Sequence, residues 1–342
     1  MASRVATVFN KIKYHTIKGV LTLLRVMPYN MAMALGRAIG VIIWAVDPFH
    51  RRIAEIQMRA ALQNTYSRWM PLKVFMNKGE SFIDIIRFSY MSDEKAHSRV
   101  RIYGQEHLDE ALTTNRGIMF ISAHIGNWEV ALHIPRLTGI GFSIPANRHK
   151  DDEIESLIQQ VRSSARATLL PPKGGIVATL ICELKAHRHI GFIVDIRGKR
   201  HNNFFCDYFG IPAPTSPAPA FVALKADALV LPVYVIKEGD TFGLYFSPAV
   251  EARSFGTDAD EIEKLRESTP SEAVQKLSDY MQAWVESVIR QHPVQWIWQY
   301  PRWINRSDMR HLLRSGIDFK QYVEDQARRL SNHPYLEFRY KD

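Results

Sequence analysis

Short apolar runs alternate with stretches of helical periodicity along the middle of this 342-residue chain. This pattern constrains the fold more than any other feature. The apolar runs predict strands at residues 117–122, 142–145, 167–170, 190–194 and 228–236. The stretches between them predict helices at residues 127–137, 151–165, 175–186 and 216–226. Strands separated by single helices need crossover connections, so we expect an α/β fold whose mostly parallel sheet is covered by helices on both faces.

Other elements are expected around this core. Residues 242–247 should pair antiparallel with the strand before them. Further helices are expected at residues 51–66, 72–90, 271–290 and 307–331. No internal repeat or linker divides the chain. We therefore expect one large domain over residues 51–342, preceded by a helical segment over residues 1–50.

Basic residues are concentrated at the N-terminus. The net charge is +9, and the first 46 residues hold no Asp or Glu. Six basic residues lie there: Arg4, Lys11, Lys13, Lys18, Arg25 and Arg37. The remaining residues are nearly balanced, with 38 basic (44 − 6) against 35 acidic side chains. A nucleic-acid-binding domain would spread its basic stripe over the fold, so no nucleic-acid partner is expected.

The same segment is apolar. Residues 19–27 and 31–46 form two apolar pieces separated by Pro28. The longest apolar run without a charge, residues 38–46, is nine residues long, short of the roughly 20 that span a bilayer. A helix lying in the lipid interface, with its arginines reaching the headgroups, fits best. A single span, a signal peptide and a buried helical hairpin are the alternatives.

Several chemistries lack their sequence signatures. Only two cysteines occur, which excludes a disulfide scaffold and favours a reducing compartment. The chain has no P-loop, no dinucleotide-binding glycine motif, no G-x-S-x-G elbow and no H-E-x-x-H pair.

One motif carries chemistry. His124 follows the strand at residues 117–122, at the edge where α/β sheets bind ligands. Glu129 falls in the first turn of the next helix, from which it could accept the Nδ1 proton of His124 and leave Nε2 as a base. The alternative is a strand-end histidine beside a carboxylate that complements the helix dipole.

The segments FISAHIGNWEV, FIVDIRG, DYFGIPAPTSPAPAFVALKADALVLPVYV and PVQWIWQYPRW resemble the late acyltransferases of lipid A biosynthesis, the lauroyl and myristoyl transferases. These enzymes belong to the lysophospholipid acyltransferase superfamily. The resemblance covers roughly residues 15–305, and the H-x4-E and FG-x-PA-x-T blocks are its strongest parts.

The resemblance assigns roles to individual residues. It implies that His124 is the general base and that Glu129 fixes its tautomer. It matches Arg148 to a family arginine that usually has aromatic and proline neighbours, both missing here. It also matches Lys173 to the lysine of a Lys-Gly pair, and Asp195 to an aspartate at the end of a strand.

Two further residues are candidates for substrate binding. The chain reads Asp195-Ile196-Arg197 where the family often continues Asp-Gln, a departure that could affect acceptor recognition. Arg197, with Lys199 and Arg200, could engage a phosphate or an acidic carrier protein. Thr215 ends the FG-x-PA-x-T block. Ordinary structural roles are the alternatives: solvated cations at Arg148, Lys173 and Arg197, a turn cap at Asp195 and a rigid loop at Thr215.

The resemblance implies an O-acyltransferase. A fatty acyl chain would pass from a thioester, on acyl carrier protein or coenzyme A, to a hydroxyl of a membrane glycolipid, a lipid A precursor, at the cytoplasmic face of the inner membrane. Arg148 or backbone N–H groups near Gly126 would stabilise the oxyanion. No metal and no cofactor beyond the thioester co-substrate is expected. The alternatives are acylation of another lipid, such as a phosphatidylinositol mannoside or a lysophospholipid, and a non-catalytic membrane-bound scaffold.

Overall fold

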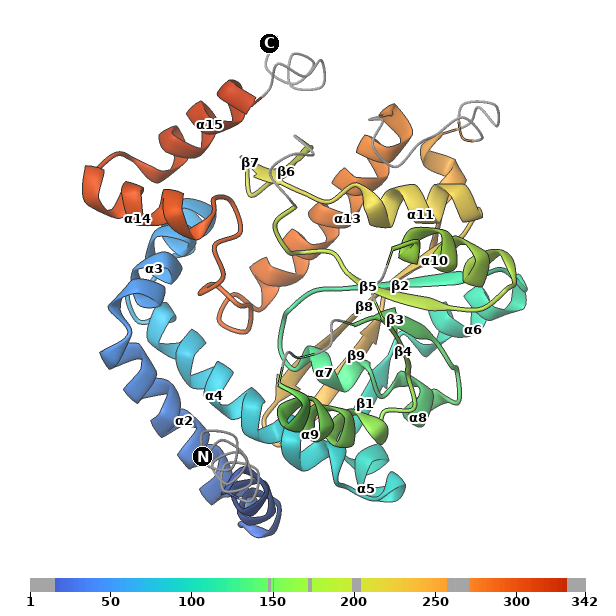
Figure 1. Cartoon of the computed structure of the whole chain (residues 1–342), viewed down its shortest axis with the longest axis horizontal. Helices are drawn as coiled ribbons and strands as arrows, with labels where there is room; N and C mark the ends of the chain where they lie inside the picture. The colour runs from blue at the N-terminus through green and yellow to red at the C-terminus, as the bar shows by residue number, and fades with distance from the viewer. Residues whose placement is uncertain are drawn as a thin grey trace, which may run out of the picture.

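A mixed sheet forms the centre of the computed structural model, which describes residues 16–146, 149, 151–171, 174–198, 204–256, 262 and 271–330. The strand order is β1-β9-β8-β2-β5-β3-β4, with β10 beside β8 (Figure 1). The strands are β1 (Val100–Tyr103), β2 (Ile118–Ser122), β3 (Ser143–Pro145), β4 (Thr168–Leu170), β5 (Ile190–Ile193), β8 (Leu229–Glu238), β9 (Thr241–Phe246) and β10 (Val250–Glu251). Only β9 and β10 run antiparallel to their neighbour β8, which confirms the mostly parallel sheet.

Helices cover both faces of this sheet, and further helices pack at one side of it. They are α2 (Tyr29–Val46), α3 (Pro48–Leu62), α4 (Met70–Ser89), α5 (Asp93–Ser98), α6 (Gln105–Thr113), α7 (Trp128–Ala131), α8 (Ile134–Thr138), α9 (Asp152–Ser163), α10 (Ile176–Lys185), α11 (Ala218–Ala226), α13 (Glu272–Gln291), α14 (Arg306–Ser315) and α15 (Phe319–Leu330). Side chains of β2 alternate between two cores. Met119 and Ile121 pack in the core that includes α10, α11 and α13, whereas Ile118 and Phe120 pack in the core that includes α6 and α8.

The sequence did not predict β1, β10, α5 or α6, and the structure differs from the elements that it did predict in three further places. The helix expected at residues 127–137 is two short helices, α7 and α8, and α8 begins around Pro135. The tail helix expected at residues 307–331 is broken at Gly316, which has a φ of +68°. Finally, a hairpin of β6 (Phe205–Tyr208) and β7 (Ile211–Pro214) occupies part of what the sequence indicated as a long loop.

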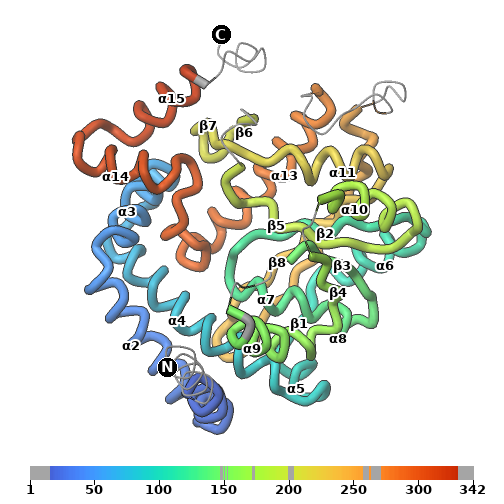
Figure 2. The backbone as a smooth tube through the Cα atoms, in the orientation of Figure 1, coloured from blue at the N-terminus to red at the C-terminus, as the bar shows by residue number. Residues whose placement is uncertain are grey.

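The two N-terminal apolar pieces are helical. Residues 16–26 form one helix and α2 forms the next. Helix α2 packs along α4 through glycines. A methyl group at Gly40 would overlap the carbonyl oxygen of Phe75, and one at Gly79 would overlap the carbonyl oxygen of Gly36. The two backbones therefore approach each other as closely as glycine allows. Figure 2 shows these helices together at one side of the molecule, with α14 and α15 beyond α3.

The outer face of α2 is apolar and exposed. Met31, Ile42 and Val46 are among its exposed side chains, and Val46 is 72% exposed. Within the described part of the chain, α2 is the one helix that is long and apolar enough to cross a membrane, and 22% of it is buried. Helix α2 is therefore a possible membrane-associating segment. The boundary at residue 50 between the N-terminal segment and the large domain stays a prediction.

Candidate active site

His124 and Asp195 meet because they follow neighbouring parallel strands. Ser122, the last residue of β2, lies opposite Ile193, the last residue of β5. The ladder continues with a hydrogen bond from the backbone N–H of Val194 to the carbonyl oxygen of Ser122, 3.0 Å long. His124 and Asp195 each lie two residues beyond this pair. The strand register therefore brings their side chains together at the carboxyl edge of the sheet, the usual ligand-binding edge.

Asp195 holds His124 through two hydrogen bonds, one to the imidazole and one to the backbone. Its Oδ1 lies 2.9 Å from Nδ1 of His124, and its Oδ2 accepts the backbone N–H of His124 at 2.8 Å. Trp296 donates its indole N–H to Oδ2 at 2.7 Å. Burial raises the pKa of Asp195, but the charge of His124 and these hydrogen bonds outweigh burial and leave the pKa below its ordinary value. An ionised Asp195 keeps the proton of neutral His124 on Nδ1 and leaves Nε2 free to act as a base.

Glu129 does not hold His124, contrary to the expectation from its place five residues later. It forms a two-pronged ion pair with Arg162 of α9, with Oε2 accepting from Nε at 3.1 Å and Oε1 from Nη2 at 2.7 Å. The reason is geometric. Asp195 already occupies the Nδ1 side of His124, and Glu129 begins the short helix α7, where a nearby guanidinium is the better partner for two carboxylate oxygens.

His124, Glu129 and Arg162 line one cavity of about 570 Å³. Most of its wall is apolar and comes from β2, α7, β5 and α13, for example Phe120, Phe192 and Met281. A cavity of this size and lining suits an apolar ligand held against a few polar groups. An alkyl chain can therefore lie in the cavity with a reactive carbonyl beside the imidazole.

Thr215 also lines this cavity, and its hydroxyl belongs to a buried network. Oγ1 of Thr215 donates to the carbonyl oxygen of Ala213 at 2.9 Å and accepts from Nη2 of Arg302 at 2.8 Å. The same Nη2 donates to Gln282 at 3.1 Å. Arg302 is fully buried, and desolvation lowers its pKa. Thr215 therefore helps to satisfy a buried cation next to the cavity.

The structure does not place the other sequence-based candidates at the cavity. Arg148 and Lys173 lie outside the described residues. Arg197 is not among the residues that line the cavity; its backbone N–H donates to the hydroxyl of Tyr300 at 3.2 Å. The N–H of Gly126, an oxyanion candidate, instead donates to the carbonyl oxygen of Gln295 at 2.9 Å. Within the described ranges, no group of three or more His, Cys, Asp or Glu side chains could hold a metal ion.

Sequence reasoning missed two residues of the site. Trp296 lies in the segment PVQWIWQYPRW, which carried part of the family resemblance, but nothing local linked it to Asp195. Arg162 lies in the last turn of α9, and no spacing rule joins it to Glu129, 33 residues earlier. A search for cations able to pair with Glu129 would have found it among several.

Comparisons with known proteins identify the family. The Bacterial lipid A biosynthesis acyltransferase family matches residues 6–305. The chain is also similar to phosphatidylinositol mannoside acyltransferases. The one from Mycobacterium tuberculosis strain CDC 1551 / Oshkosh is 23% identical over 66% of this chain and 67% of the relative. The one from Mycolicibacterium smegmatis strain ATCC 700084 / mc(2)155 is 24% identical over 65% and 68%. In strain H37Rv of Mycobacterium tuberculosis the identity is 23%, over 59% of this chain and 60% of the relative.

The family match spans nearly the whole fold, including the strands that carry His124 and Asp195. With the cavity beside a positioned histidine, it leads to one conclusion: this chain belongs to the bacterial lipid A biosynthesis acyltransferase family and is an O-acyltransferase.

Proposed function

We propose that this acyltransferase moves a fatty acyl chain from a thioester to a hydroxyl of a membrane glycolipid, with His124 as the general base. The observation that carries the proposal is the His124–Asp195 hydrogen bond at the wall of an apolar cavity. The acyl chain occupies the cavity, and Nε2 of His124 takes the proton of the acceptor hydroxyl as its oxygen attacks the thioester carbonyl. The C–S bond then breaks, and the protonated His124 returns the proton to the leaving thiolate.

Arg162 is our candidate for stabilising the oxyanion. Glu129 holds Nε and Nη2 of Arg162, and Nη1 makes no hydrogen bond within the described part of the chain. Glu129 thus acts as the residue that positions Arg162, and its negative charge is matched before substrate arrives. A fixed cation beside a developing negative charge is a strong source of transition-state stabilisation. Arg148, Lys173 and Arg197 remain proposals as contacts for anionic groups of the substrates, and Thr215 as part of the cavity wall.

The proposed acceptor is a lipid A precursor, which the family description supports. A phosphatidylinositol mannoside is the second candidate, because that is the substrate class in the names of the similar mycobacterial enzymes. The proposed donor is acyl carrier protein or coenzyme A thioester. The proposed location is the cytoplasmic face of the inner membrane, with α2 in contact with lipid.

The test is an assay of the purified protein with both types of thioester and three acceptors: a lipid A precursor, a phosphatidylinositol mannoside and a lysophospholipid. Mass spectrometry should find one added acyl chain on a glycolipid. His124→Ala, shown by circular dichroism to be folded, should lower the rate by about 10²- to 10⁴-fold, the contribution of general-base catalysis. Acylation of the lysophospholipid alone would refute the glycolipid acceptor. No acyl transfer to any of the acceptors would support the scaffold alternative.

A further inference from the structure

A second cavity, of about 440 Å³, shares one wall with the first. Trp128 lines both cavities, and its ring packs edge-on against His124 with the ring centres 5.1 Å apart. The walls of the second cavity come from α2, α4, the end of β8 and residues 295–299. Trp128 therefore connects the second cavity with the base, although His124 itself does not line that cavity.

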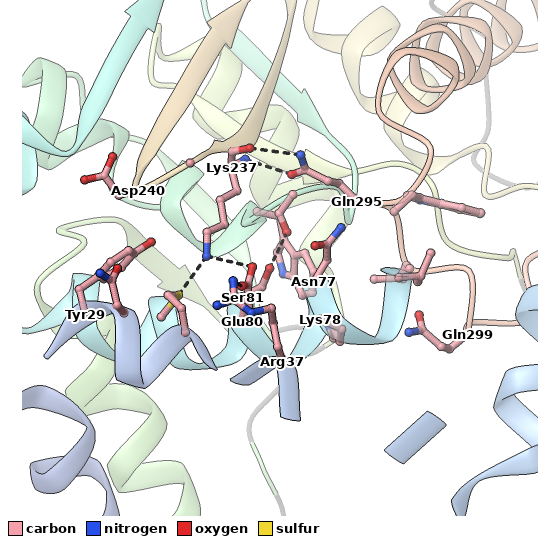
Figure 3. Close-up of a pocket in the computed structure, with 18 residues that line it drawn as sticks. Tyr29, Arg37, Asn77, Lys78, Glu80, Ser81, Lys237, Asp240, Gln295 and Gln299 are labelled. Atoms are coloured by element: carbon pink, nitrogen blue, oxygen red, sulfur yellow. Dashed lines mark hydrogen bonds and ion pairs between the residues drawn. The ribbon is translucent and has the colours of Figure 1, made fainter. Parts of the chain in front are cut away.

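Ion pairs hold the walls of this polar cavity in place. Nζ of Lys237 lies 3.1 Å from Glu80 and 2.9 Å from Asp84, and Arg37 donates to Glu80 at 2.7 Å. The side-chain amide of Gln295 bonds both the N–H and the carbonyl oxygen of Lys237. Figure 3 shows Lys237 reaching from the strand end across to Glu80. These contacts join α2, α4 and β8, so the cavity is a built part of the fold.

Other polar groups in the same cavity are left without partners. Within the described ranges, the side chains of Lys78, Asp240 and Gln299 make no hydrogen bond or ion pair. The hydroxyl of Tyr29 is buried and has no hydrogen-bond partner. Nζ of Lys78 lies 3.8 Å from the centre of the Trp128 ring. The buried hydroxyl of Tyr29 is thus unsatisfied. The exposed side chains of Lys78 and Asp240 and the half-buried side chain of Gln299 are open to a ligand at the same hollow, and together these groups indicate a polar ligand there.

The chemistry of these groups identifies the class of ligand. Amide and carboxylate side chains match sugar hydroxyls, which both donate and accept hydrogen bonds. Lys237 and Arg37 are already paired with carboxylates. Among the residues that the structure describes, the negative charge that acts on Lys78 is Glu129, and Glu129 is paired with Arg162. Lys78 is therefore free to bind an anion such as a phosphate.

The neighbouring surface shows how such a ligand would arrive. Asn30, Met33 and Arg37 of α2 line the polar cavity, while Met31, Leu35 and Ile42 of the same helix expose apolar side chains. A lipid with its tails against α2 could thus place its head in the polar cavity. We infer that this cavity binds the phosphorylated sugar head of the acceptor lipid, with Lys78 on the phosphate and with Asp240 and Gln299 on the sugar. The inference rests on the proposed function, because it assigns that reaction's acceptor to a place.

The test compares Lys78→Met, Asp240→Asn and Gln299→Leu with Lys73→Met, an exposed lysine on the same helix that lines neither cavity. In steady-state kinetics with the glycolipid that the wild-type enzyme acylates, each cavity variant should raise the KM for acceptor, by about tenfold for Lys78→Met. The KM for the thioester should not change. An acceptor without its phosphate should make Lys78→Met equivalent to the wild type.

Direct binding provides a second measurement. The deacylated head of the same glycolipid should bind the full-length wild-type and Lys73→Met proteins in calorimetry, and should bind Lys78→Met more weakly. Unchanged acceptor KM and head-group binding in all three cavity variants would overturn the inference. A rise in the thioester KM instead would assign the cavity to the donor and overturn it as well. Both results leave the acyl-transfer proposal intact, because that proposal fails only if the wild-type enzyme acylates no glycolipid.

Discussion

Two carboxylates lie at this active site, and the protein holds them in opposite ways. The side chain of Asp195 is fully buried and accepts hydrogen bonds from His124 and Trp296. The side chain of Glu129 is 19% exposed, lines the apolar cavity and is paired with Arg162. Asp195 is thus built to fix an imidazole, and Glu129 to fix a guanidinium. The comparison shows that distance along the chain did not decide which carboxylate serves the histidine: 71 residues separate His124 from Asp195, and five separate it from Glu129.

Asp195→Asn should lower kcat more than any other change. The amide keeps the shape of the carboxylate but cannot stabilise a protonated imidazole, and it can favour the wrong tautomer of His124. We expect kcat to fall by about 10³- to 10⁴-fold with little change in either KM. Asp109→Asn, at an exposed position of α6, is the matched control. A kcat within threefold of the wild-type value would remove Asp195 from the mechanism.

Changes to Glu129 or to its partner Arg162 should lower kcat less. Arg162→Met removes the proposed oxyanion donor and should lower kcat by about 10²- to 10³-fold. Glu129→Gln keeps one hydrogen bond of the pair and should have a smaller effect.

Nitrogen NMR of His124 distinguishes the roles of the two carboxylates, because the tautomer should change in Asp195→Asn and stay the same in Glu129→Gln. A changed tautomer in Glu129→Gln would return Glu129 to the histidine, as the sequence first suggested.

The smallest expected effect is on the acid stability of the fold, through the buried carboxylate of Asp195. The pKa of Asp195 is lower in the folded protein than in the unfolded chain, where it is about 3.9. Its contribution to the free energy of unfolding is therefore complete above that value and is lost as the pH falls toward the folded pKa. Denaturant unfolding from pH 6 to pH 3 should show the stability gap between wild type and Asp195→Asn shrinking with acid. A gap that stays constant with pH would contradict the lowered pKa.

Much of the fold could be predicted from the sequence because its signals are local. Apolar runs and helical periodicity predicted β2, β3, β4, β5, β8 and β9 and most helices, including the antiparallel pairing of β8 with β9. They did not predict the edge strand β1 or the two-residue strand β10. The same reasoning placed His124 and Asp195 at strand ends. It could not pair them, because their contact depends on β2 and β5 being neighbours in register. It also missed Arg162 and Trp296, whose roles arise only from packing between distant segments.

The glycine contact between α2 and α4 has a consequence for how the enzyme meets a bilayer. Gly36 and Gly40 lie so close to the α4 backbone that α2 cannot swing away or slide without losing its packing. Any lipid contact through the outer face of α2 therefore sets the height and tilt of the whole body above the membrane. A loosely tethered enzyme would sample many depths, whereas lipid contact through α2 would hold the imidazole at one level relative to the lipid.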